Sequence, residues 1–363
     1  MNVLQIGVVS ISGGGVSSYI KSIISKSNLK INYYIGVAQP KDEINNAKFL
    51  NFDMRYNPLT LISRVFKLNR HVKSQGINLI HAHTQRAGLI VAFLKMINKK
   101  VHIVYTPHGF RHTQLKGLRK SIHYIFELFI LAKIDKMTAI TDLEVREIPK
   151  YSHKILKIKS VIDTDVEIEQ VDLKKNLNIC SNSKVVAMLG SVDDRKQPYL
   201  FIDIASKAPD DVYFVWIGAG DKLLEVNNYL EEKNLTNKVF FLGGVDREHV
   251  YGILCNVDVL LMTSSSEGFP LSILEAYFIG KTVVSNDFLG VDEIVDNKKN
   301  GVIFEFNDSF DAANKLNEVL INKDFKLELE RNAREFVVPY VDIERFTNEY
   351  LNLYFSYYSS VES

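Results

Sequence analysis

The chain of 363 residues has few cysteines and no long apolar run, and each shortage excludes a class of protein. Cys180 and Cys255 are far apart in segments that look buried, so we expect a reducing compartment and no disulfide framework. The most apolar stretch, residues 122–134, carries ionisable side chains and is too short to span a bilayer. Met1 precedes a strand-like run without a charged leader region, so we expect a cytoplasmic protein with no signal peptide.

Charge is unevenly distributed, although the net charge is only +1. Of the 44 Lys and Arg and 43 Asp and Glu, residues 1–165 contain 25 basic and 10 acidic, which leaves 19 and 33 for the remainder. So large a split predicts that the first part faces an anionic partner. Nucleic acid is not expected, because basic and aromatic residues are not interleaved in any recognised module. An anionic membrane surface suits the basic segment 111–120, to which charge is added by Lys67, Arg70, Lys73, Lys99 and Lys100.

Apolar strand candidates alternate with helical patterns along the whole chain, which predicts parallel sheets with crossover helices. Two Rossmann-like domains of the α/β class are therefore expected. The strands are predicted at residues 3–9, 31–37, 79–81, 102–106 and 136–140, then at 185–189, 213–217, 239–242, 257–262, 282–285 and 301–304. The apolar pattern lapses between residues 158 and 175, where the charge balance also changes sign, so the domain join is predicted there.

The segment Ser264–Glu275 carries the most information about function. It follows the apolar run of residues 257–262, and Pro270 suits the first position of a helix because its missing N–H is not needed there. The unpaired backbone N–H groups at the helix start form a site for phosphate or pyrophosphate. Glu267 and Glu275 flank that site, and carboxylates repel phosphate but accept hydrogen bonds from sugar hydroxyls. A phosphate site between two hydroxyl acceptors is typical of a protein that binds a nucleotide sugar.

The spacing of these residues resembles a known family. Glu267-Gly-Phe-Pro-Leu-Ser-Ile-Leu-Glu275 is similar to the signature of the retaining glycosyltransferases of family 4, also called group 1, which have the GT-B fold. The resemblance implies two Rossmann-like domains that face a cleft, and a C-terminal helix that returns to the first domain. It implies an acceptor-binding domain at 1–165, a nucleotide-sugar-binding domain at 166–340 and a return helix at 341–363.

The resemblance also assigns roles to residues. Glu267 is expected to contact the donor sugar and Glu275 to hold the ribose diol. Thr106-Pro-His108-Gly-Phe110 closes a predicted strand and resembles the family's His-Gly, so His108 joins Glu267 as a catalytic residue, in a neutral or charged form. Further donor contacts are expected from Gly268, Phe269, Pro270, Leu271 and Ser272.

Two more loops are expected to contact the donor. Gly13-Gly-Gly15 looks like the family's Gly-Gly loop, so Gly14 and Gly15 are expected to border the cleft near the transferred sugar. A simple turn is the alternative, and a dinucleotide-binding loop is opposed by the spacing and by the missing ribose acid. Lys196 resembles the family's pyrophosphate-binding lysine. Ser191 stands where the family usually has arginine, so Arg195 is assigned the second positive charge.

His81-Ala-His83 and Asp163-Thr-Asp165 each suggest a metal site, but neither is interpreted as one. The histidine pair has no third ligand in a matching context, so a structural or acceptor-side role is predicted. Asp165 resembles the last residue of the family's Asn-Gly-x-Asp at the domain join, although the Asn-Gly is missing. We therefore expect no metal ion and no cofactor, and we expect Lys196 and a helix N-terminus to offset the charge of the leaving diphosphate.

The sequence thus predicts a retaining hexosyltransferase that uses a nucleotide-diphosphate sugar, with uridine diphosphate as the expected carrier. The expected acceptor is a membrane glycolipid or a polyprenyl-linked saccharide of envelope polysaccharide synthesis, met at the inner face of the cell membrane. The alternatives are a nucleotide-sugar 2-epimerase, a non-catalytic GT-B partner subunit and an NAD-dependent dehydrogenase. The sugar, the linkage, the acceptor's identity and the oligomeric state stay open.

Overall fold

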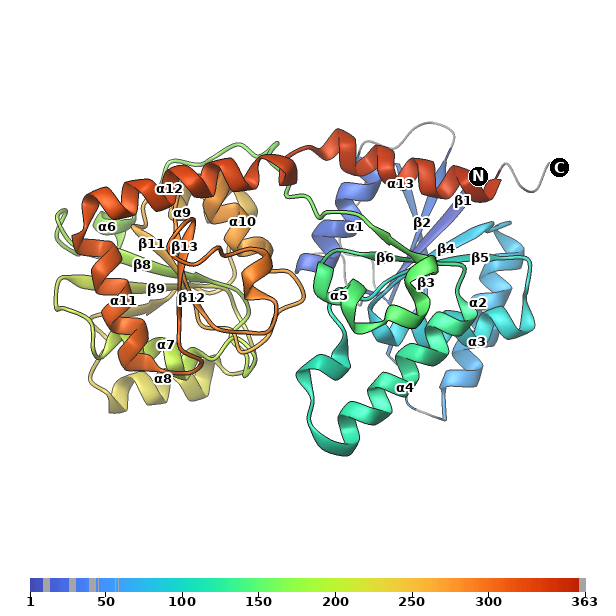
Figure 1. The fold of residues 1–363 in the computed structure, drawn as a ribbon, viewed down its shortest axis with the longest axis horizontal. Helices are drawn as coiled ribbons and strands as arrows, with labels where there is room; N and C mark the ends of the chain where they lie inside the picture. Colours follow the sequence, from blue (N-terminus) through green and yellow to red (C-terminus); the bar gives the residue numbers. More distant parts are fainter. Residues whose placement is uncertain are drawn as a thin grey trace. The chain divides into compact units, whose positions relative to one another are not determined.

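The structure is a computed structural model that describes residues 1–8, 14–25, 31–38, 44, 46–55, 57 and 59–358. The chain divides into two compact units, of which unit 1 comprises Met1–Asp163 with Asp342–Ser363 and unit 2 comprises Thr164–Val341. Each unit is a parallel sheet with helices on its faces (Figure 1). The sequence placed the domain changes after residues 165 and 340, and the units change at 163 and 341.

Seven parallel strands form the sheet of unit 1 within its described residues, in the order β3-β2-β1-β4-β5-β6-β7. The order reverses between β1 and β4, and ligands of such sheets bind outside the carboxyl ends of the strands at this point. The strands are β1 (Asn2–Ile6), β2 (Asn32–Val37), β3 (Ala47–Asn51), β4 (Leu79–His83), β5 (His102–Thr106), β6 (Lys136–Ala139) and β7 (Ile155–Lys157). The helices are α1 (Gly15–Ser25), α2 (Leu61–Ser74), α3 (Thr84–Ile97), α4 (Gly117–Lys133), α5 (Asp142–Glu147) and α13 (Ile343–Tyr358), with short 3-10 turns at Arg111–Gln114 and Pro149–Lys154.

Unit 2 has a six-stranded parallel sheet in its described part, in the order β10-β9-β8-β11-β12-β13, which reverses between β8 and β11. Its strands are β8 (Lys184–Leu189), β9 (Val212–Ile217), β10 (Val239–Phe241), β11 (Val259–Met262), β12 (Val283–Asn286) and β13 (Gly301–Phe304). Its helices are α6 (Leu173–Asn176), α7 (Pro198–Ala205), α8 (Leu223–Glu232), α9 (Arg247–Cys255), α10 (Leu271–Phe278), α11 (Ser309–Ile321) and α12 (Lys323–Val337), with 3-10 turns at Val291–Glu293 and Val338–Tyr340. Central strands such as β11 are buried along their whole length, which explains their continuous apolar sequence.

Each of the eleven strands predicted from the sequence coincides with an observed strand. Residue 9 of the first prediction lies outside the described residues. The two strands that were not predicted, β3 and β7, are the edges of the unit 1 sheet. Their side chains are mostly half-buried or exposed, so they lack the apolar run that marks a central strand.

Helix α13 belongs to unit 1, as the resemblance implied, and lies beside α1 (Figure 1). Its residues Phe346, Tyr350 and Tyr354 are fully buried, and the hydroxyl groups of Tyr350 and Tyr19 are 2.6 Å apart. The aromatic stripe of the last helix is therefore core packing of the first unit.

The prediction that both cysteines are buried is wrong, because Cys180 and Cys255 are exposed. Cys255 is the last residue of α9 and is exposed although residues 250–254 before it are all buried, and Cys180 lies in the loop after α6. The apolar residues before Cys255 therefore did not indicate that burial ends with the helix. Among the described residues, no helix has the length and apolar character needed to cross a membrane.

Candidate functional site

The Ser264–Glu275 segment connects β11 to α10 in unit 2. Because β8 and β11 are neighbouring parallel strands, the loops that follow them meet at the same edge of the sheet. Two hydrogen bonds join these loops. The backbone N–H of Ser265 donates to the carbonyl of Arg195 at 2.8 Å, and Thr263 Oγ1 donates to the carbonyl of Lys196 at 2.6 Å. The sheet topology thus brings Glu267 next to two basic residues that are distant in the sequence.

The carboxylate of Glu267 is buried between two cations. Lys196 Nζ lies 2.6 Å from Oε1, and Arg195 NH1 lies 2.7 Å from Oε2. Only 8% of the Glu267 side chain and 9% of the Lys196 side chain are exposed. Burial alone would raise the pKa of Glu267, but the positive charges of Lys196 and Arg195 outweigh it and lower the pKa. We call these three residues the Glu267 cluster, and its carboxylate is ionised at neutral pH.

Gly190, directly after β8, makes room for the lysine of this cluster. A Cβ atom at position 190 would lie 2.8 Å from Lys196 Cε, so a larger residue would displace the ammonium group from Glu267. The carbonyl of Gly190 accepts a hydrogen bond from Trp216 Nε1 at 2.9 Å, which fixes the backbone at this point. The glycine after the strand therefore serves the geometry of Lys196.

The two basic residues that were predicted to bind pyrophosphate contact Glu267 in this structure. The Glu267 cluster has one more positive than negative charge, and 40% of the Arg195 side chain is exposed. Lys has three side-chain donors and Arg has five, so both keep N–H groups for further acceptors. The cluster can therefore hold a carboxylate in position and still offer donors to phosphate or sugar oxygens.

Helix α10 begins one residue later than predicted, because Pro270 is its N-cap rather than its first residue. Ser272 in its first turn is buried, and the ring of Phe269 stacks on Tyr340 at 5.6 Å between centroids. Glu275 is half-buried and stands four positions after Leu271, so both lie on one face of the helix. Helical side chains lean toward the N-terminus, which directs Glu275 to the end where the N–H groups are unpaired.

His108 lies in unit 1, in the loop after β5. Its φ of 56° is left-handed, which costs on the order of 1–3 kcal/mol for a residue other than glycine. The next N–H, of Gly109, donates to Oε1 of buried Glu144 at 2.7 Å, and Ile140 N donates to Oε2 at 2.6 Å. A buried carboxylate thus holds the strained loop in place, and strain of this kind is common at functional sites.

A chain of buried hydrogen bonds connects His108 to the C-terminal helix. As its amide is oriented in the structure, Gln5 Nε2 donates to the hydroxyl of Tyr354 at 3.1 Å, so Gln5 Oε1 accepts from His83 Nε2 at 2.8 Å. His83 Nδ1 then accepts from His108 Nε2 at 2.9 Å. The hydroxyl of Tyr354 donates to His81 Nδ1 at 2.7 Å. We call these five residues the histidine network.

The histidine network also continues into the sheet. His81 Nε2 donates to Thr106 Oγ1 at 2.7 Å, and Thr106 bonds in turn to the hydroxyl of Thr138. Tyr350 donates to the same Thr138 hydroxyl at 3.1 Å. Both ring nitrogens of His81 have partners, which gives His81 a structural role.

The network defines the protonation of His108. Burial lowers the pKa of His108 to about 3, so the imidazole is neutral at physiological pH. Because its proton is on Nε2, Nδ1 carries a lone pair and can accept a hydrogen bond. Of the two forms that the sequence left open, the structure favours the neutral one, which can orient a hydroxyl but cannot offset the charge of a leaving phosphate.

The glycine loop before α1 lies in the same unit. Gly13 lies outside the described residues, Gly14 has a φ of 88° and Gly15 begins the helix. Tyr19, one turn further on, contacts the ring of His108 edge-on at 4.8 Å between centroids. The start of α1 and His108 are therefore close neighbours, whereas Glu267, Glu275 and Lys196 belong to unit 2.

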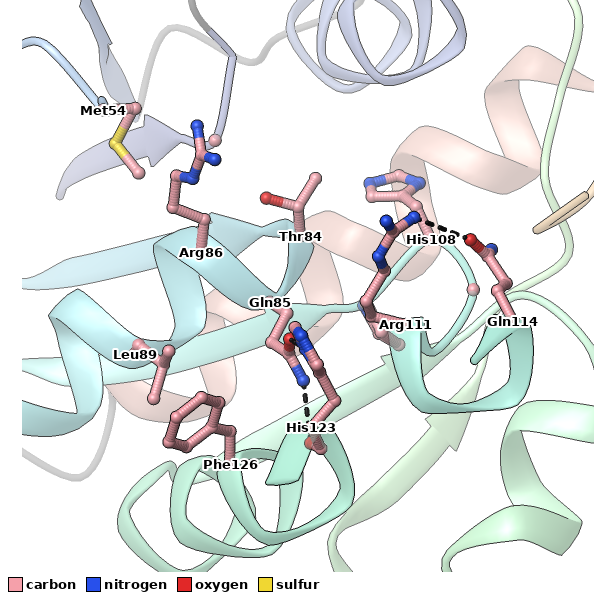
Figure 2. Close-up of a pocket in the computed structure, with 13 residues that line it drawn as sticks. Met54, Thr84, Gln85, Arg86, Leu89, His108, Arg111, Gln114, His123 and Phe126 are labelled. Carbon is pink, nitrogen blue, oxygen red and sulfur yellow. Dashed lines mark hydrogen bonds between the residues drawn. The ribbon is translucent and has the colours of Figure 1, made fainter. Parts of the chain in front are cut away.

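A pocket of about 520 Å³ opens in unit 1 beside His108 (Figure 2). Its lining comes from the start of α3, the loop after β5 and one side of α4, and includes Thr84, Gln85, Arg86, Arg111 and His123. Neither Gln85 nor Arg86 is among the site residues predicted from the sequence. Their position directly after β4, at the carboxyl edge of a parallel sheet, could have predicted that they line a ligand site.

Comparison with known proteins agrees with this geometry. Residues 169–336 match the family described as Glycosyl transferases group 1, and residues 37–152 match the Glycosyl transferase 4-like domain. The chain belongs to the group 1 glycosyltransferases. The two parallel-sheet units are those of the GT-B fold, and sucrose-phosphate synthase from Thermosynechococcus elongatus has a similar structure, with a TM-score of 0.85 at 18% identity over 99% of this chain and 100% of that one.

Two similar glycosyltransferases have described substrates. UDP-Gal:alpha-D-GlcNAc-diphosphoundecaprenol alpha-1,3-galactosyltransferase of Escherichia coli is 27% identical over 80% of this chain and 78% of its own length. N,N'-diacetylbacillosaminyl-diphospho-undecaprenol alpha-1,3-N-acetylgalactosaminyltransferase of Campylobacter jejuni is 26% identical over 82% of each chain. Both names specify a sugar linked to diphosphoundecaprenol as the acceptor.

Proposed function

We propose that this glycosyltransferase transfers a hexose from a UDP-linked sugar to a polyprenyl-linked saccharide or related membrane glycolipid, with retention at the anomeric carbon. The observation that carries the proposal is the pair Glu267 and Glu275 around the start of α10. The names of the two relatives support the acceptor class, and one of them supports UDP as the carrier. The product belongs to the synthesis of an envelope polysaccharide.

Unit 2 holds the donor in this proposal. The backbone N–H groups of Leu271 and Ser272 bind the diphosphate, and Phe269 and Pro270 fix the turn that presents them. Glu275 accepts hydrogen bonds from the ribose diol, and Glu267 accepts from a hydroxyl of the hexose. Gly268 allows the sugar to approach the backbone closely.

The leaving diphosphate gains negative charge as the glycosidic bond breaks. Lys196 and Arg195 have further N–H groups and offset this charge together with the N-terminus of α10, in place of a divalent ion. The new bond forms between the acceptor oxygen and the anomeric carbon on the face from which the diphosphate leaves. The acceptor proton passes to an oxygen of the departing phosphate, so no carboxylate nucleophile is needed.

Unit 1 contributes His108 and the acceptor site. The neutral His108 accepts a hydrogen bond at Nδ1 from a hydroxyl of the transferred sugar, while the start of α1 with Gly14 and Gly15 borders it. The orientation of this hydroxyl fixes the ring for attack from one face.

The same unit is suited to peripheral contact with the inner face of the cell membrane. Large apolar side chains are exposed on α2, where Ile62 and Phe66 are 67% and 60% exposed, and on α4, where Leu118 and Ile125 are 77% and 61% exposed. Lysines and arginines of the basic segment 111–120 flank the second group. Apolar and basic side chains together bind anionic lipid surfaces.

A thermal-shift panel of nucleoside diphosphates and nucleotide sugars tests the donor, because a ligand that binds the native state raises Tm with its affinity. The proposal predicts the largest shift for UDP and a UDP-hexose, unchanged by EDTA. Incubation with the donor alone distinguishes transfer from 2-epimerisation, since an epimerase releases an epimer without any acceptor. No shift with any nucleotide would contradict the proposal.

A further inference from the structure

The unit 1 pocket contains positive charge to which the reaction above gives no role. Arg86 from the first turn of α3 and Arg111 from the loop after β5 both line it (Figure 2). Among the described lining residues there is no Asp or Glu, and within the described chain neither arginine forms an ion pair. Arg111 NH1 donates to the amide oxygen of Gln114 at 3.2 Å. Two guanidinium groups in one pocket suit an anion with more than one charge.

The titratable neighbours of the arginines do not cancel this charge. Burial is the main reason that the pKa values of His108 and His123 are lowered, so both rings are neutral at pH 7. Glu127 lies behind Gln85, whose Nε2 donates to Glu127 Oε1 at 2.7 Å. Burial raises the pKa of Glu127 to about 8, so this carboxyl group is also largely neutral. The charge of the pocket at neutral pH is therefore that of its arginines.

The other end of the pocket is apolar and continues along the helix surfaces. Figure 2 shows Leu89 and Phe126 close together, away from Arg111. From Leu89, exposed apolar side chains follow at helical spacing along α3, over about 12 Å at 1.5 Å per residue: Phe93, Met96 and Ile97 are 37%, 53% and 50% exposed. On α4, which runs parallel to α3, Phe126 lines this end of the pocket and the half-buried Phe129 follows it in the same direction. The rings of Phe93 and Phe129, 5.0 Å apart, hold the two helices together.

We propose that this pocket binds the diphosphate of a prenyl diphosphate carrier, with Arg86 and Arg111 on the diphosphate and the first isoprene units along the apolar face of α3 beside Phe126. The inference rests on the proposed function, because it takes a carrier-linked saccharide as the acceptor. An inorganic anion would make no contact with the apolar face of α3. An uncharged glycolipid would bring no negative charge to the two arginines. The acceptor sugar next to the diphosphate then lies beside His108.

Calorimetric titration of the full chain tests this site with three probes: farnesyl diphosphate, farnesol and inorganic pyrophosphate. Saturating UDP is present so that the nucleotide site in unit 2 is occupied. Farnesyl diphosphate is expected to bind at least about tenfold more tightly than either other probe. Arg86→Gln and Arg111→Gln, both at exposed positions, are each expected to weaken its binding by about tenfold or more. Phe126→Ser is expected to weaken the binding of farnesyl diphosphate but not that of pyrophosphate. Lys150→Gln removes a positive charge outside the pocket and is the matched control.

Unchanged affinity in both arginine variants would overturn the proposal. Equal affinity for pyrophosphate and farnesyl diphosphate would contradict a prenyl carrier as the ligand and would show that the pocket binds only the anion. The two proposals fail separately. If UDP does not bind the wild-type chain, the proposed function fails, and the probes are then titrated without it. If UDP binds wild type and the arginine variants equally, and the affinity for farnesyl diphosphate is also the same in all of them, only the pocket assignment fails.

Discussion

His108 donates a hydrogen bond from Nε2 to Nδ1 of His83 across 2.9 Å, and this contact determines which nitrogen of His108 carries the proton. His83 can accept there because its own proton goes to Gln5, whose amide is held by Tyr354. Tyr354 belongs to α13, so the last helix of the chain controls a residue in the loop after β5. The return helix is therefore part of the site as well as of the core.

The first prediction concerns the tautomer of His108. In ¹⁵N-histidine spectra of the wild-type chain, Nε2 should be protonated and Nδ1 unprotonated throughout pH 5–8, because burial holds the pKa near 3. Tyr354→Phe removes the hydroxyl that orients Gln5, and should mix the tautomers and lower kcat by about tenfold without weakening donor binding. Tyr33→Phe is the control, since the buried Tyr33 hydroxyl has no hydrogen-bond partner in the described chain. A proton on Nδ1 in wild type would contradict the network.

A second prediction concerns the buried ion pair of the Glu267 cluster. Lys196→Met leaves Glu267 with Arg195 alone and should lower the free energy of unfolding by about 3 kcal/mol. Adding Glu267→Gln removes the buried carboxylate that has lost one of its two cations, so the double variant should be more stable than Lys196→Met. Denaturant titration measures both, with the exposed pair variant Lys222→Met as the control. If the losses of the single variants Lys196→Met and Glu267→Gln added up to the loss of the double variant, Lys196 and Glu267 would not be coupled.

The third prediction separates turnover from donor binding. Glu267→Ala and His108→Ala each remove a contact to the transferred sugar, and should lower kcat by about a hundredfold or more while changing donor affinity less. Steady-state kinetics with the preferred nucleotide sugar provide the measurement. If kcat stayed within a factor of two of wild type in both variants, neither side chain would act on the reacting sugar.

Much of the fold and part of the site follow from the sequence. Apolar runs predicted the central strands, and Pro270 placed the start of α10 to within one residue. The sequence did not predict that Lys196 and Glu267 form an ion pair, because this contact depends on β8 and β11 being neighbours in the sheet. The pairing of His83 with His108 depends in the same way on β4 and β5. Contacts between loops at one sheet edge require the strand order, which the apolar pattern does not contain.

The fourth prediction is a pH dependence due to Glu127. Burial raises its pKa from 4.5 to about 8, so the folded state keeps a proton that the unfolded state loses. Stability from this group is complete below pH 4.5 and is lost as the pH rises to about 8, by at most about 1.4 kcal/mol per pH unit. Glu127→Gln cannot lose a proton, so its stability relative to wild type should increase from pH 5 to pH 8. Parallel stability curves for the two proteins would contradict a neutral Glu127.

In the proposed function the start of α10 forms a nucleotide site with Glu275, and calorimetric titration of UDP measures binding there. Glu275→Ala should weaken UDP binding by about tenfold or more, because a charge-assisted hydrogen bond to the ribose is lost. Glu318→Ala, on an exposed part of α11, should bind UDP like wild type. UDP affinity that is the same in wild type, Glu275→Ala and Glu318→Ala would place the nucleotide elsewhere and contradict the assignment.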